Sequence, residues 1–86
     1  MKITLFATTT CPYCKMVKDY LAAKNLPFTE KLIDQDELAK SEMMRLSDGY
    51  LGVPFTLVEK DNGETKKIVG FDQKLFDETI STNEHQ

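Results

Sequence analysis

The sequence has little of what several classes of protein require. It contains no tryptophan, one histidine and only two cysteines among 86 residues, too few for the disulfide framework of a small secreted domain. Acidic residues outnumber basic ones by 14 to 11, which argues against a nucleic-acid partner because phosphate binding requires a clustered basic surface. No apolar run approaches the roughly 20 residues that span a bilayer, so we expect no membrane association.

What is present fits one small domain. Hydrophobic residues make up 41% of the chain and charged residues 29%, proportions that are typical of a globular protein. A chain of this length can bury one modest core, so we expect a single domain over residues 1–86. The apolar stretch at the start is too short for a signal peptide, and we expect a cytoplasmic monomer.

Apolar patterning predicts four strands and three helices in the order βαβαββα. The strands are expected at 2–7, 28–33, 55–59 and 65–69, and the helices at 12–24, at about 36–46 and after residue 72. A helix separates the first two strands, so they should be parallel, whereas the last two should form an antiparallel hairpin. The fold class is therefore α/β, with a mixed four-stranded sheet and helices on its faces.

Capping residues suggest where the helices begin and end. Pro12 suits a first helical turn, where its missing N–H is no loss. Asp34, with Glu37 three residues later, resembles a capping box for the second helix, and Asp72 is expected to cap the third. The residues from Ser81 onward read as a frayed polar tail.

The motif Cys-Pro-Tyr-Cys, which begins at Cys11, lies between the first strand and the first helix. Cys11 is therefore expected at the helix N-cap, where unpaired amides and the helix dipole favour a thiolate, the nucleophile of disulfide exchange. Its sulfur should accept hydrogen bonds from the amides of Tyr13 and Cys14. Lys15 and Lys18 should add positive potential.

The two cysteines should differ in burial and in role. Cys14 shares an apolar stripe with Val17 and Leu21, so Cys11 would attack and Cys14 would resolve the mixed disulfide. Zinc binding and an inert pair are the alternatives. A tetrahedral zinc site needs two further ligands, and because His85 lies in the tail, a single chain cannot complete a common site. We therefore expect no metal.

The motif and its setting resemble the glutaredoxin family, which has the thioredoxin-like fold. The resemblance continues at Gly52-Val53-Pro54 before the third strand and at Gly70-Phe71-Asp72 after the fourth, and it extends over residues 2–80. It implies a glutathione-dependent thiol–disulfide oxidoreductase that reduces protein disulfides or glutathione mixed disulfides. It also implies that glutathione is a co-substrate and that no cofactor is tightly bound.

Carried over residue by residue, the resemblance makes Cys11 the nucleophile and Cys14 the resolving thiol. The residues it assigns to glutathione are Tyr13, Val53, Pro54, Gly70, Phe71 and Asp72. Among them, Val53 would pair with glutathione through its backbone, a cis peptide bond would precede Pro54, and residues 70–72 would hold the γ-glutamyl end. Structural roles stay open for Asp72 as a helix cap, for Phe71 in packing and for Tyr13 as an exposed aromatic.

Other interpretations of the function also stay open. Gly49-Tyr50-Leu51 and Gly70-Phe71 resemble glutaredoxin-like electron donors of ribonucleotide reductase, which tend to be reduced by thioredoxin reductase. Gly52 and Val69 stand where glutaredoxins usually carry threonine and glycine. A third possibility is a dimer that binds an iron–sulfur cluster through one Cys11 from each chain and two glutathione thiols.

Overall fold

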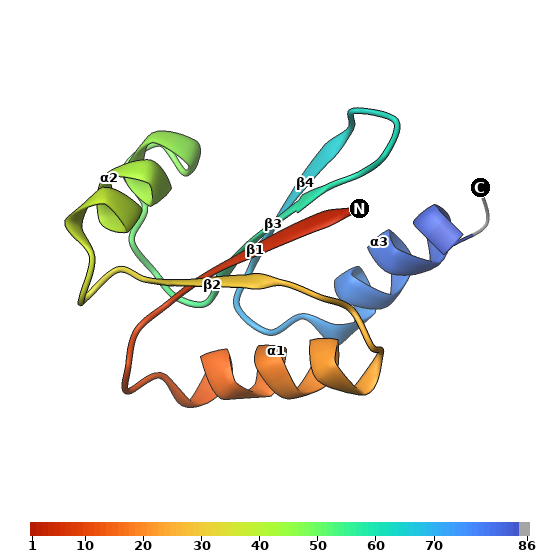
Figure 1. Ribbon diagram of the computed structural model, residues 1–86, viewed down its shortest axis with the longest axis horizontal. Helices are drawn as coiled ribbons and strands as arrows, with labels where there is room; N and C mark the ends of the chain where they lie inside the picture. Colours follow the sequence, from red (N-terminus) through yellow and green to blue (C-terminus); the bar gives the residue numbers. More distant parts are fainter. Residues whose placement is uncertain (85–86) are drawn as a thin grey trace.

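The computed structural model describes residues 1–84, and its elements follow the order that the sequence predicts (Figure 1). The strands are β1 (Lys2–Ala7), β2 (Thr29–Leu32), β3 (Phe55–Glu59) and β4 (Thr65–Val69). The helices are α1 (Pro12–Ala23), α2 (Glu37–Leu46) and α3 (Gln73–Glu84). The predicted βαβαββα fold class is confirmed.

The strands form one mixed sheet in the order β2-β1-β3-β4. As predicted, β1 and β2 are parallel and β3 and β4 are antiparallel, and β1 also pairs antiparallel with β3. Phe6 lies opposite Phe55, so β1 ends where β3 begins. The loop that follows β1 and the loop that precedes β3 therefore meet at the same end of the sheet.

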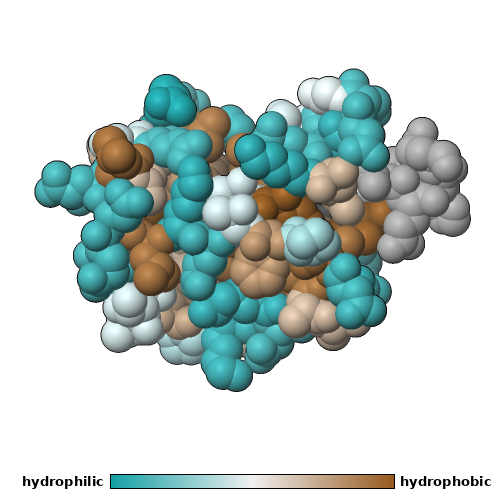
Figure 2. All heavy atoms as spheres, in the orientation of Figure 1, coloured by the Kyte–Doolittle hydropathy of each residue, from teal (hydrophilic) through white to brown (hydrophobic). Residues whose placement is uncertain are grey.

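Helices cover both faces of the sheet because β1 is apolar on both sides. Leu5 belongs to a core cluster with Val17 of α1 and Phe76 of α3. Phe6, the next residue, belongs to a smaller cluster with Met43 of α2. Hydrophilic residues cover much of the face shown in Figure 2, with hydrophobic ones near its centre and over α2. No helix within residues 1–84 is long and apolar enough to cross a membrane.

The helix ends agree with the sequence at α3 and differ from it at α2. Asp72 caps α3, since its carboxylate accepts a hydrogen bond from the amide of Leu75 at 3.1 Å. The N-cap of α2 is Asp36, which accepts from Leu38 and Ala39. The predicted cap at Asp34 is wrong because that carboxylate binds another part of the chain.

The C-terminal end of the chain is helical over more residues than expected. Helix α3 continues to Glu84, whereas the sequence suggested a polar tail from Ser81. His85 and Gln86 lie outside the described residues, so the expectation for the histidine stays a prediction.

Candidate active site

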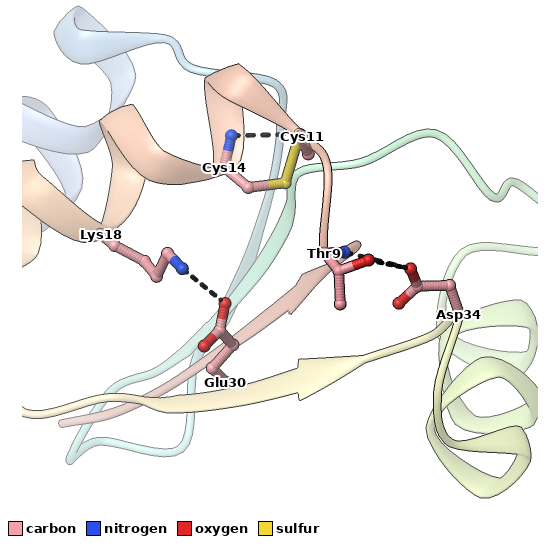
Figure 3. Close-up of polar contacts among 6 residues, drawn as sticks. All are labelled: Thr9, Cys11, Cys14, Lys18, Glu30 and Asp34. Carbon is pink, nitrogen blue, oxygen red and sulfur yellow. Dashed lines mark hydrogen bonds and ion pairs between the residues drawn. A yellow bond between two sulfur atoms is a disulfide. The ribbon is translucent and has the colours of Figure 1, made fainter.

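A disulfide joins Cys11 to Cys14 at the start of α1 (Figure 3). Cys11 is the N-cap with an extended backbone, and Pro12 occupies the first turn, as the sequence predicts. The amide of Cys14 donates to Cys11 Sγ at 3.1 Å. Among the described residues, no corresponding bond comes from the amide of Tyr13. One helix amide therefore contacts the sulfur of Cys11 in this oxidised state.

The two cysteines have very different exposure. Cys14 is only 1% exposed and lies in the core cluster with Val17 and Leu21, whereas Cys11 is half-buried at the edge of that cluster. In disulfide exchange, a thiolate of one molecule must come into direct contact with a disulfide sulfur of the other. Cys11 is the member of the pair that another molecule can reach.

The two lysines expected to add positive potential both have acidic partners. Lys15 pairs with Asp19 at 3.2 Å on the exposed side of α1. Lys18 pairs with Glu30 of β2 at 3.0 Å, which also ties the helix to the sheet (Figure 3). Their contribution at Cys11 is offset by these carboxylates, so the positive end of α1 is the main source of favourable potential for a thiolate.

The loop that precedes β3 lies beside the start of α1. The peptide bond between Val53 and Pro54 is cis, Pro54 is buried and Val53 is half-buried against both core clusters. Figure 3 shows the ribbon that leads into β3 next to the disulfide. The backbone of Val53 is therefore placed at the end of the sheet that carries the cysteines.

The segment that joins β4 to α3 is hydrogen-bonded to the loop before β3 at the same end of the sheet. The amide of Gly70 donates to the carbonyl oxygen of Pro54 at 2.8 Å, and Gly70 has φ of +74°, a conformation that favours glycine. The ring of Phe71 lies 6.1 Å from that of Tyr20 and 6.2 Å from that of Phe76. Phe71 thus packs against α1 and α3, the structural role that the sequence left open.

The remaining residues assigned by sequence are exposed. Tyr13 is 61% exposed on the first turn of α1, and Asp72 is exposed at the start of α3, where its carboxylate already serves as the cap. The start of α1 and the loops that precede β3 and α3 together carry all eight assigned residues, and the fold brings these three segments to one end of the sheet.

The structure also shows a polar contact between Thr9 and Asp34 that the sequence did not suggest. Asp34 accepts two hydrogen bonds from Thr9, at 3.1 Å from the amide and at 2.7 Å from the hydroxyl (Figure 3). The hydroxyl, followed by the amide, lowers the pKa of Asp34. The parallel register could have revealed this pair, because Ala7 lies opposite Leu32 and each partner follows two residues later.

Replacement of Asp34 with alanine is expected to destabilise the protein slightly at neutral pH. Because folding lowers the pKa of Asp34, the carboxylate stabilises the fold fully above its ordinary pKa of 3.8 and loses that contribution as the pH falls below it. Urea midpoints of wild type and variant should thus differ most near about pH 7, and the difference should shrink as the pH falls progressively below 3.8. Thr9→Val removes the same hydroxyl donor and serves as the companion variant. A difference that stays constant with pH would contradict this role for Asp34.

The fold and the cysteine pair together define the class of this protein. A dithiol that begins a helix, with one reachable and one buried sulfur, is suited to reversible disulfide exchange. Among residues 1–84, no group of three or more histidine, cysteine, aspartate or glutamate side chains is placed to hold a metal ion. The chain is a redox protein of the thioredoxin-like fold with a Cys-x-x-Cys dithiol.

Comparison with known proteins identifies the family. Residues 3–61 match the family model of glutaredoxin, and the chain belongs to that family of thiol oxidoreductases. A glutaredoxin-like 8.6 kDa protein of the rubredoxin operon of Clostridium pasteurianum is 36% identical over 78 residues, which are 91% of this chain and 96% of that protein.

Solved structures agree with this assignment. The crystal structure of a glutaredoxin from Archaeoglobus fulgidus has a TM-score of 0.72 at 25% identity and is matched over 92% of this chain and 85% of that chain. The thioredoxin-like protein BC3987 has a TM-score of 0.74 at 25% identity, with 90% of this chain and 97% of that chain covered.

Proposed function

We propose that this protein reduces disulfides with the Cys11–Cys14 dithiol and is returned to its reduced form by glutathione. The observation that carries this proposal is the asymmetry of the pair, with a reachable sulfur at a helix N-cap and a buried sulfur one turn later. Membership of a thiol oxidoreductase family supports the same chemistry.

The reaction proceeds in two exchanges. The thiolate of Cys11 attacks one sulfur of the substrate disulfide, and the other substrate sulfur leaves as a thiolate that takes a proton from water. Cys14 then loses its proton and attacks the sulfur of Cys11, which breaks the mixed disulfide and releases the second substrate thiol. The substrate gains two electrons, and the protein ends with the Cys11–Cys14 disulfide of this structure.

Glutathione would reverse these steps in the protein. One glutathione thiolate attacks Cys11 and frees Cys14, and a second attacks the resulting mixed disulfide, so that two glutathione molecules become one glutathione disulfide. Glutathione is thus a co-substrate, and the proposal includes no tightly bound cofactor. Its cysteinyl part would pair with the backbone of Val53 beside Pro54, and its γ-glutamyl end would lie at residues 70–72, with Tyr13 alongside.

A second source of electrons has support of its own. Gly52 and Val69 depart from the usual glutaredoxin residues, and the structural likeness to a thioredoxin-like protein is as close as that to a glutaredoxin. Thioredoxin reductase would then reduce the Cys11–Cys14 disulfide back to the dithiol. Ribonucleotide reductase is the disulfide substrate that the sequence resemblance suggests. With either reductant, the protein would work in a reducing compartment such as the cytoplasm.

One comparison of reductants tests both proposals. The oxidised protein is mixed with NADPH and either glutathione plus glutathione reductase or thioredoxin reductase alone, and the thiols formed on the protein are counted by alkylation and mass spectrometry. We expect the glutathione system to reduce the Cys11–Cys14 disulfide many times faster. Reduction by thioredoxin reductase, with no reduction by the glutathione system, would favour thioredoxin reductase as the source of electrons and overturn the glutathione proposal.

A further inference from the structure

A groove lies on the face of the sheet opposite α1, between the end of α2 and the end of β4. Its volume is about 440 Å³, and its apolar walls include Leu46, Tyr50, Phe55 and Val69. Phe55 belongs to the core cluster on the α2 side of the sheet, whereas Cys14 belongs to the cluster on the other side. The groove walls also include none of the residues assigned to glutathione, so the groove is distinct from the proposed glutathione site.

The groove nevertheless adjoins the active-site end of the sheet. Phe55 directly follows Pro54, and Val69 directly precedes Gly70. Tyr50 is a third connection between the groove and the active-site end, because its side chain lies against Gly52. A Cβ atom added at Gly52 would lie 2.2 Å from the hydroxyl oxygen of Tyr50. The ring that lines the groove thus rests against the loop that leads to Val53 and the dithiol.

The exposure of the groove walls indicates an apolar occupant. Val69 is 52% exposed and Tyr50 is 48% exposed, so both keep apolar surface that a partner could bury. The charged side chains at the groove are Asp48 and Lys67, and Lys67 Nζ donates to the carbonyl oxygen of Leu46 at 2.7 Å. One of the two charges is thus directed toward the end of α2.

The position of the groove indicates a chain longer than glutathione. The residues assigned to glutathione are not among those that line the groove, whereas a protein segment that passes the dithiol can continue past the end of β4. The sheet order leaves the outer edge of β4 without a neighbouring strand within residues 1–84, and such an edge can accept an extended segment through its backbone.

We propose that this groove receives an apolar side chain of the protein whose disulfide is reduced, close in its sequence to the reacting cysteine. This inference rests on the proposed disulfide reductase function and specifies its substrate class as proteins with an apolar segment beside the disulfide. Tyr50 and Val69 would then favour protein disulfides over small ones, because a small disulfide reaches Cys11 without touching the groove.

The test compares two disulfides in a single turnover. The pre-reduced protein is mixed with insulin or with the small neutral 2-hydroxyethyl disulfide, quenched with acid at intervals, and analysed for the Cys11–Cys14 disulfide. Val69→Lys introduces a charge where an apolar side chain would bind, and we expect about tenfold slower oxidation by insulin with an unchanged rate for the small disulfide. Val69→Ser should show a smaller loss in the same direction. Leu38→Lys is the matched control, since Leu38 is 82% exposed on α2 and outside the groove walls.

The outcomes separate this inference from the proposed function. Equal rates for wild type and both Val69 variants with insulin would overturn the groove proposal and leave disulfide reduction intact. Equal slowing of both substrates would also overturn it, because the substitution would then act on the dithiol itself. A wild-type protein that reduces neither disulfide would overturn the reductase function as well.

Discussion

Replacement of Cys11 with serine is expected to abolish disulfide reduction, with a loss on the order of 1,000-fold or more. Cys11 is the reachable sulfur at the helix N-cap, and a serine hydroxyl at that position stays protonated and is a poor nucleophile. The buried Cys14 cannot replace it, because a substrate disulfide has no path to a side chain that is 1% exposed. The measurement is the steady-state reduction of insulin and of a glutathione mixed disulfide.

Alkylation gives an independent check on the same assignment. With the reduced wild-type protein at mildly acidic pH, iodoacetamide should modify Cys11 before Cys14, because only a reachable thiolate reacts. The Cys11→Ser variant should then react slowly and only at Cys14. First labelling of Cys14 in the wild type, or substantial activity in the variant, would show that the roles are reversed.

Replacement of Cys14 with serine is expected to separate the two activities. Reduction of a glutathione mixed disulfide should persist within a few fold, because a second glutathione can release the first from Cys11. Reduction of insulin should fall at least about tenfold, since release of a protein partner depends on attack by the internal thiol. Both rates are measured with glutathione and glutathione reductase as the source of electrons.

The burial of Cys14 calls for a second variant in that experiment. A serine hydroxyl there would be buried among Val17 and Leu21, where an unpaired polar group destabilises the fold by about 1–3 kcal/mol. Cys14→Ala removes the thiol without adding a polar group, and its thermal unfolding reports whether the core stays intact. Equal loss of both activities in a folded Cys14→Ala protein would contradict the glutathione mechanism.

Local rules in the sequence were enough to predict the elements and the placement of the cysteines. Apolar stretches and turn signals located the strands, of which Lys2–Ala7, Phe55–Glu59 and Thr65–Val69 have the predicted bounds. Pro12 and the position of Cys11 after the first strand located the start of α1. Each of these signals comes from residues that are close together in the sequence, so the predictions did not require the folded structure.

Polar side chains were predicted less well, because several partners are distant in the sequence. Asp34 had the right spacing to cap α2, yet its carboxylate binds Thr9, 25 positions earlier, and the cap passes to Asp36. Lys18 looked like a source of free positive charge near the dithiol, yet Glu30 on β2 pairs with it. In each case the sequence contains both partners, but the parallel pairing of β1 with β2 and the packing of α1 on the sheet decide that they meet.

The amino-acid sequence alone specifies the class of chemistry and the chain order of the elements, because the Cys-Pro-Tyr-Cys motif and the apolar patterning act locally. The surroundings of that motif depend on how the chain folds. Pairing of β1 with β3 brought the loop of Pro54 to the end of β1 that precedes the cysteines, and a backbone hydrogen bond joins Gly70 to Pro54. Pairing of β3 with β4 placed Val69 beside Phe55 at a second, apolar surface. These contacts join segments distant along the chain, and their geometry follows from strand register and core packing, which no local pattern specifies.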